Sequence, residues 1–209
     1  HMGLATVPEH GRTFTQLVHQ TELAVTVNRS TKKNDYTVFD VTIDQEAHHR
    51  REIEHRIRQA IDTDSFELFY QPIMSGREKM PVGFEALIRL PDGKNGYISP
   101  AVFIPIAEAR GHIKTIGNWV IREAIRQIAS WPEHLTVAVN LSAVQFRDGD
   151  LVQIVENALL EAGVSGERLE IEVVESLLLD RSDAVLDQLR GLKSLGISIP
   201  RSNICGGGA

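Results

Sequence analysis

Two opposite charges lie four residues apart in one apolar stretch of the chain. The stretch runs from Val82 to Leu90, and its pattern predicts a buried β-strand with Glu85 and Arg89 on the same face. Burying unpaired charge is costly, so these side chains must pair with each other, hold a metal ion or meet an anionic ligand. A structural ion pair and a functional site both stay open here, because perturbed carboxylates mark functional sites only part of the time.

Other polar side chains stand inside or at the ends of predicted strands, where an apolar residue would be the default. They are Gln71, Asn140 and Glu172. In a (β/α) barrel, groups from the C-terminal ends of several strands converge because the strands surround one axis. Two carboxylates and an amide oxygen would make an all-oxygen site, which suits Mg²⁺ or Mn²⁺ and not zinc. Each residue alone is more commonly a satisfied core or turn group, but their equivalent positions favour a shared site.

The elements that must position these residues follow a regular pattern after residue 65. Apolar runs predict strands at residues 66–73, 82–90, 135–141 and 169–174, with a short fifth strand at 197–199. Helical periodicity predicts a solvated helix at 44–61, a helix that begins at Ser99-Pro100 with the serine as cap, and helices at 117–130, 151–162 and 182–195. Alternating strands and helices predict parallel strands with right-handed crossovers. The polar strand ends favour a (β/α) barrel over an open doubly wound sheet.

Composition restricts the setting. The chain has 209 residues, 42% of them hydrophobic, and a net charge of -6, which argues against a binder of DNA or RNA but leaves a small anionic ligand possible. No run is long enough for a membrane segment and no signal peptide is evident. The single cysteine, Cys205, excludes an internal disulfide framework and favours a reducing, cytoplasmic setting. His1-Met2 is typical of a residue left by tag cleavage.

A set of short motifs in a fixed order resembles the EAL domain family of cyclic-di-GMP phosphodiesterases. The tripeptide Glu-Ala-Leu at 85–87 alone carries little weight. The resemblance rests on the other motifs that occur with it, in the same order, across residues 66–199. The motifs are Tyr-Gln-Pro-Ile at 70–73, Glu-Ala-Leu-Ile-Arg at 85–89, Ile-Ser-Pro-Ala-Val-Phe-Ile-Pro-Ile-Ala-Glu at 98–108, Ile-Gly-Asn-Trp-Val at 116–120, Val-Asn-Leu-Ser at 139–142 and Glu-Val-Val-Glu-Ser at 172–176. Residues 19–40 also resemble the tail of a diguanylate cyclase (GGDEF) domain, without its active-site motif.

The resemblance implies a role for each candidate residue. Glu85, Asn140 and Glu172 would match ligands of a site for two divalent ions, Mg²⁺ or Mn²⁺, that activates a water for attack on a phosphodiester of cyclic-di-GMP, with Glu85 in the catalytic set. The Arg89 guanidinium would hold a substrate phosphate and Gln71 would line the substrate pocket. A further residue, Glu175, would steady a loop over the metal ions.

The family pattern also contains an Asp-Asp-Phe-Gly segment and a later lysine that this chain lacks. After residue 199 the chain continues Pro-Arg-Ser-Asn-Ile-Cys-Gly-Gly-Gly-Ala, and the stretch from Phe66 to the end spans 144 residues, against the roughly 250 of a complete barrel. We therefore expect a partial (β/α)8 TIM-like barrel, about its first half, with an N-terminal helical and extended segment. The expected organisation is residues 1–43 as tag scar and GGDEF-like remnant, 44–65 as linker helix, 66–199 as incomplete EAL domain and 200–209 as a tail foreign to the family.

This organisation leaves two functions open. One is a truncated, inactive phosphodiesterase that binds metal weakly, and the other is a degenerate EAL module that acts as a cyclic-di-GMP receptor or a protein-interaction platform. A fragment without ligand is the plainest alternative. Because a half barrel exposes the unpaired edges of its outer strands, we also expect a homo-oligomer formed through these edges.

Overall fold

The computed structural model describes residues 1–31, 36–76, 80–146, 150–173, 177 and 182–200. The chain divides into two compact units, residues 1–55 and 56–209. The first unit pairs two short parallel strands, which helix α1 covers. Its elements are β1 (Met2–Leu4), α1 (Phe14–Thr31), β2 (Tyr36–Val38) and the start of α2 (Val41–Thr63). Its core is small, with Ala24 and Phe39 buried at the centre.

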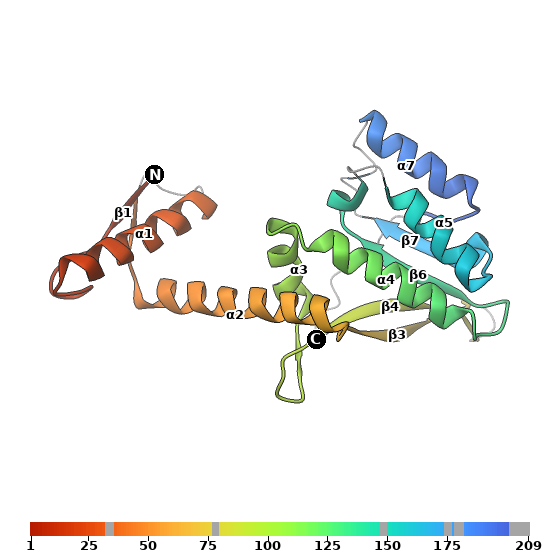
Figure 1. The fold of residues 1–209 in the computed structure, drawn as a ribbon, viewed down its shortest axis with the longest axis horizontal. Coiled ribbons are helices and arrows are strands. Elements are labelled where there is room, and N and C mark those ends of the chain that lie inside the picture. Colours follow the sequence, from red (N-terminus) through yellow and green to blue (C-terminus); the bar gives the residue numbers. More distant parts are fainter. Residues whose placement is uncertain (32–35, 77–79, 147–149, 174–176, 178–181, 201–209) are drawn as a thin grey trace. The chain divides into compact units, whose positions relative to one another are not determined.

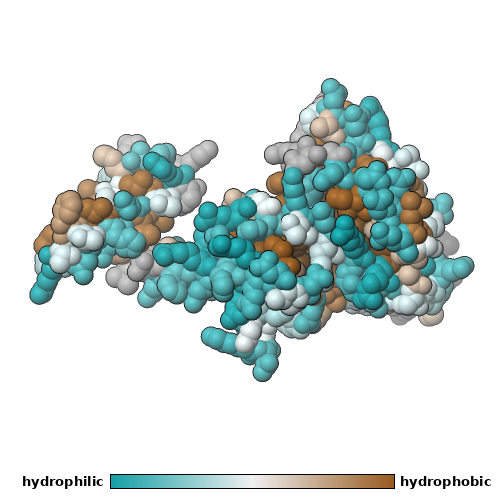
Figure 2. Space-filling model, viewed as in Figure 1, coloured by the Kyte–Doolittle hydropathy of each residue, from teal (hydrophilic) through white to brown (hydrophobic). Residues whose placement is uncertain are grey.

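Helix α2 matches the charged segment for which the sequence predicts a solvated helix. Its apolar stripe is buried at Ile53, Ile57 and Ala60, while hydrophilic residues dominate the side seen in Figure 2. The helix runs from Val41 to Thr63, a few residues longer at each end than predicted. Among the described residues, no helix combines the length and the apolar character that a membrane span requires.

The second unit is built on a mainly parallel sheet with helices packed along one side. The strand order is β3-β4-β6-β7, and the short β5 pairs with β4. The strands are β3 (Glu67–Met74), β4 (Pro81–Pro91), β5 (Tyr97–Ile98), β6 (Thr136–Leu141) and β7 (Leu169–Val173). The helices are α3 (Pro100–Ala109), α4 (Ile113–Ile128), α5 (Leu151–Ala162) and α7 (Asp183–Ser194), with single 3-10 turns at Ala143–Phe146 and Gly166–Arg168. Figure 1 shows α4, α5 and α7 on the same side of this sheet.

The order of elements and the mainly parallel sheet confirm the expected α/β fold, part of a (β/α) barrel. Buried residues of α4, such as Val120 and Ala124, and the buried valines of β6, Val137 and Val139, form the centre of the core. A fifth strand is represented by one parallel bridge between Glu170 and Ser198.

One local prediction was wrong, and a second, that of Ser99 as the cap of α3, is right in position but not in its hydrogen bond. Strands β3 and β4 are antiparallel, because they follow each other within a few residues and a parallel crossover needs about a dozen. Ser99 precedes α3, but its hydroxyl makes no capping hydrogen bond and its backbone carbonyl accepts from Val102 and Phe103 instead. In contrast, α5 ends as predicted at Gly163, whose φ of 64° is favourable only for a residue without a Cβ.

Candidate functional site

The antiparallel pairing of β3 and β4 places two of the predicted residues side by side. Gln71 lies directly opposite Glu85, and Glu67 lies opposite Arg89. Cross-strand partners in this register point to the same face of the sheet. Gln71 is exposed on that face and Glu85 is partly exposed. The register of β3 and β4 therefore places Gln71 beside Glu85, although β3 is antiparallel to β4.

The parallel strands bring the other two residues to the same face. Asn140 on β6 is in register with Glu172 on β7, and the Asn140 side-chain amide donates a hydrogen bond of 2.7 Å to Glu85 Oε1 on β4. The apolar neighbours Val139 and Ile171 are buried on the opposite face, beneath the helices. The alternation inferred from the sequence is thus confirmed, and the four residues lie on one face of the sheet. Glu85, Asn140 and Glu172 form a row across β4, β6 and β7, with Gln71 opposite Glu85 on β3.

Arg89 is separate from this row. Its guanidinium donates to the carbonyl of Ile88 at 3.0 Å and lies over the Phe69 ring, 5.1 Å from its centroid. Within the described chain no ion pair joins Arg89 to Glu85, so the structural ion pair considered from the sequence is not what forms. The Arg89 residue is partly exposed.

The carboxylates of Glu85, Glu170 and Glu172 lie close enough together for their charges to repel one another. Burial raises the pKa of Glu172 above its usual range, and the nearby charges of Glu85 and Glu170 raise it further. Such repulsion is what a bound cation relieves. In the described ranges, however, no three or more His, Cys, Asp or Glu side chains gather closely enough to hold a metal ion on their own. The site here supplies two carboxylates and one amide, and Glu175 lies outside the described residues.

A cavity of about 240 Å³ opens beside the ends of these strands. Asn140 and Glu172 line it, together with apolar residues of α3, α4 and β4. Three polar residues that sequence reasoning missed also line it: Glu108, Ser142 and Gln145. Glu108 and Ser142 belong to the motifs at 98–108 and 139–142, so their place in these motifs was the available signal.

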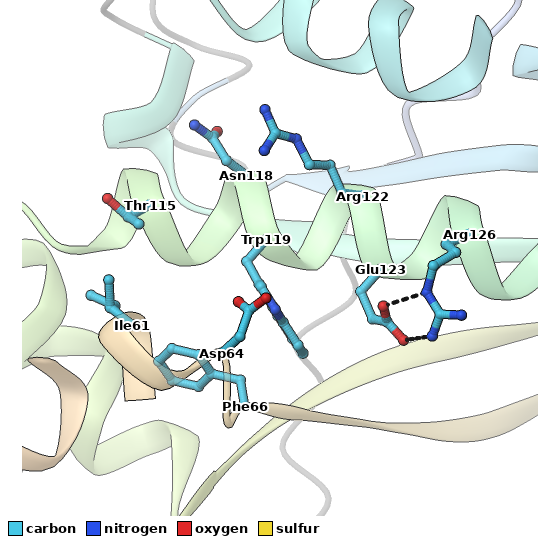
Figure 3. A pocket seen from close by; sticks show the side chains of 9 residues that line it. All are labelled: Ile61, Asp64, Phe66, Thr115, Asn118, Trp119, Arg122, Glu123 and Arg126. Carbon is cyan, nitrogen blue, oxygen red and sulfur yellow. Dashed lines mark hydrogen bonds and ion pairs between the residues drawn. The ribbon is translucent and has the colours of Figure 1, made fainter. Parts of the chain in front are cut away.

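A second hollow of about 370 Å³ lies along α4 and contains none of the predicted site residues (Figure 3). Trp119 and Phe66 pack against each other in its lining, with their ring centroids 5.6 Å apart. The guanidinium of Arg126 donates to both carboxylate oxygens of Glu123. We therefore assign the candidate site to the strand ends, where the predicted residues meet, and not to this hollow.

Comparison with known proteins identifies the class. The model of the EAL domain family matches residues 54–206, and the chain therefore belongs to the EAL domain family. It is 35% identical over 198 residues to an uncharacterized signaling protein of Caulobacter vibrioides, covering 95% of this chain and 24% of that protein. It is 34% identical over 202 residues to the bifunctional diguanylate cyclase/cyclic di-GMP phosphodiesterase MucR of Pseudomonas aeruginosa, covering 95% of this chain and 30% of MucR.

Solved structures agree with this assignment. The MucR phosphodiesterase in complex with cyclic-di-GMP superposes with a TM-score of 0.69 at 36% identity, covering 76% of this chain and 66% of that one. The EAL enzyme Bd1971 in its cGMP-bound form gives a TM-score of 0.70 at 25% identity, covering 95% of this chain and 56% of that one. The chain thus spans about a quarter to a third of the two curated relatives named above. The relatives of the chain include proteins that are named as cyclic di-GMP phosphodiesterases.

Proposed function

We propose that this chain is an EAL-type cyclic-di-GMP phosphodiesterase module whose site is the row formed by Glu85, Asn140 and Glu172. The observation that carries the proposal is the 2.7 Å hydrogen bond from the Asn140 amide to Glu85, together with the register of Asn140 and Glu172. These contacts join three neighbouring strands at one edge. Membership of the EAL family and the likeness to a cyclic-di-GMP complex supply the ligand.

The donor set fits a hard divalent cation such as Mg²⁺ or Mn²⁺. Carboxylate and amide oxygens are its preferred ligands, and the raised pKa of Glu172 reflects repulsion that a cation would remove. When bound, the ion would activate a water and neutralise charge on the phosphate. Glu85 and Glu172 would bind it as carboxylates, and the Asn140 amide would keep its N–H bond to Glu85 while its Oδ1 oxygen binds the ion.

The remaining residues would bind substrate. Arg89 lies on the same face of β4 as Glu85, and its planar guanidinium suits a phosphate. Gln71 is exposed opposite Glu85 and offers both a donor and an acceptor to the dinucleotide. We keep the sequence-based role of Glu175, steadying a loop over the metal ions, as part of this proposal.

Titration calorimetry tests the site. We expect the unaltered chain to bind cyclic-di-GMP more tightly with Mn²⁺ present, and Glu172→Gln to lose most of that gain. Glu161→Gln is the matched control, because Glu161 is an exposed carboxylate on α5, away from the strand ends. Cyclic-di-GMP binding that is absent with and without Mn²⁺, or equally affected by both changes, would contradict the proposed site.

We further propose that the 209-residue chain hydrolyses cyclic-di-GMP poorly and acts, by itself, as a receptor. The described ligand set of two carboxylates and one amide supports this, since a two-ion site needs more oxygen ligands. Release of the linear dinucleotide by the purified chain, dependent on Mg²⁺ or Mn²⁺, would contradict it. Binding without turnover is the expected result.

The wider organisation is proposed on the same basis. Residues 1–43 would contain the remnant of a GGDEF domain, 44–65 would form a linker helix, and the EAL domain would follow it. The alignment with MucR, which is named as a diguanylate cyclase as well as a phosphodiesterase, supports the GGDEF part because it covers 95% of this chain. We place the protein in the cytoplasm, where the nucleotide signal would reach it.

We also propose a homo-oligomer formed through the outer strand β3. This strand stands at the end of the described sheet and exposes Phe69 and Met74. Unpaired strand edges recruit other strands. Light scattering is expected to give at least twice the 23.3 kDa mass of the chain, and a stable monomer at high concentration would contradict the proposal.

A further inference from the structure

The turn that follows β6 is held from two helices at once. Ser142, two residues beyond Asn140, donates its hydroxyl to Glu108 Oε1 on α3 at 2.6 Å. Its backbone N–H donates to Gln145 Oε1 at 3.0 Å, and its hydroxyl oxygen accepts from the Val144 N–H at 3.3 Å. Ser142 therefore uses its hydroxyl in both directions and its backbone amide as well, which leaves the turn little freedom.

Glu108 lies at a helix position that is electrostatically unfavourable for a carboxylate. It lies in the last turn of α3, which ends at Ala109, and carboxylates are unfavourable near the negative C-terminal end of a helix dipole. It is exposed, so packing does not explain its place. Its short, charge-assisted bond to Ser142 does explain it, since such bonds are roughly twice as strong as neutral ones.

The Gln145 side chain is held in place by close packing against α4. The residue is only 5% exposed, and its Nε2 is buried without a hydrogen-bond partner. The amide packs so closely on Gly117 that a Cβ there would approach Gln145 Cδ to 2.5 Å and Oε1 to 2.8 Å. Flipping the amide would bring Nε2 against the Ser142 N–H, so the observed orientation is the one that satisfies the turn.

The backbone of Asn140 is held in the sheet, but its side chain has little to hold it. Its side chain is exposed, and its only hydrogen bond among the described residues is the one to Glu85. The strand that carries it pairs with β7 up to Leu141, and the turn at Ser142 begins at the next residue. Asn140, Glu108, Ser142 and Gln145 line the same cavity, so the anchored turn borders the space that the Asn140 side chain occupies.

We propose that Glu108, acting through Ser142, and Gln145, seated on Gly117, are positioning residues that direct the Asn140 amide toward Glu85. The importance of this alignment for ligand binding rests on the proposed function, whereas the alignment itself does not. Outer groups that orient a metal ligand typically change metal affinity or activity by about 10- to 100-fold when lost.

The side-chain amide signals of Asn140 in a ¹⁵N-labelled sample test the alignment without any ligand. The signals are assigned by their loss in Asn140→Asp. In Glu108→Ala and in Ser142→Ala we expect them to shift toward those of a free amide and to exchange faster with water. Glu108→Gln keeps an oxygen that accepts from Ser142 and should leave them in place, which separates a hydrogen-bonding role from one of charge.

Glu161→Ala is the matched control, because Glu161 is also an exposed glutamate next to the last residue of its helix. Unchanged Asn140 signals in both alanine variants would overturn the proposal, and so would Glu108→Gln behaving like Glu108→Ala. If Glu108→Ala does not fold, Ser142→Ala and Glu108→Gln decide the matter.

Calorimetry with Mn²⁺ and cyclic-di-GMP then separates the two proposals. Glu108→Ala is expected to weaken binding by about 10-fold and Glu108→Gln by less than about twofold. Absence of binding by the unaltered chain would refute the proposed function, while the Asn140 signals would still confirm or refute the positioning. Binding that stays unchanged after the Asn140 signals have moved would refute the importance of the alignment.

Discussion

Tyr70 on β3 has a phenol whose pKa is strongly raised by its surroundings. Burial, and after it the charge of Glu123, raise the pKa of its phenol from 10.0 to about 12, while the charge of Arg126 opposes the change. The ring packs edge-on against Trp131, with centroids 5.1 Å apart, and the hydroxyl is buried without a hydrogen-bond partner. Tyr70→Phe removes that hydroxyl and keeps the ring contact.

The sign and size of the effect follow from linkage. As pH rises through 10, the unfolded chain ionises first, so the wild type loses stability between pH 10 and pH 12. Two pKa units at about 1.36 kcal/mol each set an upper bound of roughly 2.7 kcal/mol. Because the side chain is only half-buried, we expect about 1 kcal/mol of this to be realised. Below pH 9 the variant should be as stable as the wild type or slightly more so, since it removes an unsatisfied hydroxyl.

Urea unfolding at pH 8 and pH 11, followed by circular dichroism, measures both effects. Tyr70→Phe should lose less stability than the wild type between these pH values, by about 1 kcal/mol. Tyr36→Phe on β2 is the control, because that ring is 51% exposed. Equal losses in the wild type and Tyr70→Phe would refute the reasoning. A variant that is less stable at pH 8 by more than about 1 kcal/mol would show that the hydroxyl has a partner after all.

Two further changes test how the row of site residues is built. Glu85→Gln should lower the pKa of Glu172, seen by carbon NMR of the carboxyl group, but leave it above its usual range because burial, the larger cause, remains; an unchanged pKa would contradict the crowding. Gly83→Ala should cost about 1–3 kcal/mol of unfolding free energy in urea, since a Cβ there would lie 2.8 Å from the Thr136 carbonyl oxygen where β4 and β6 begin to pair. Gly76→Ala, where nothing lies within 4 Å of the added atom, is the control, and equal effects at both positions would refute the steric argument.

Local pattern was enough for most of the secondary structure. Helix α5 has the predicted bounds, Leu151–Ala162, because an amphipathic run ending at a glycine is specified by neighbouring residues alone. The faces of β6 and β7 also followed from alternation, since a strand buried on one side repeats every two residues. The start of α4 at Ile113 was missed by four residues, because helix ends carry weaker signals than helix centres.

What pattern could not supply was the partner of each polar group. Glu85 and Arg89 share a face as predicted, yet Glu85 accepts from Asn140, 55 residues away, and Arg89 turns to Phe69. Likewise, nothing near Glu108 in sequence indicates that it would bind Ser142, 34 residues later. Hydrogen bonds between distant elements depend on strand register and helix packing, which a single sequence does not encode locally.

The chain's own residues therefore settled the family, the order of its elements and which side chains face away from the core, because motifs and periodicity are local properties. The tertiary structure decided the rest: that β3 pairs antiparallel with β4, that Glu85 meets Asn140, and that the turn at Ser142 is anchored by Glu108. The physical reason is that a polar group at a strand end takes whichever partner the packed neighbours bring within hydrogen-bonding distance.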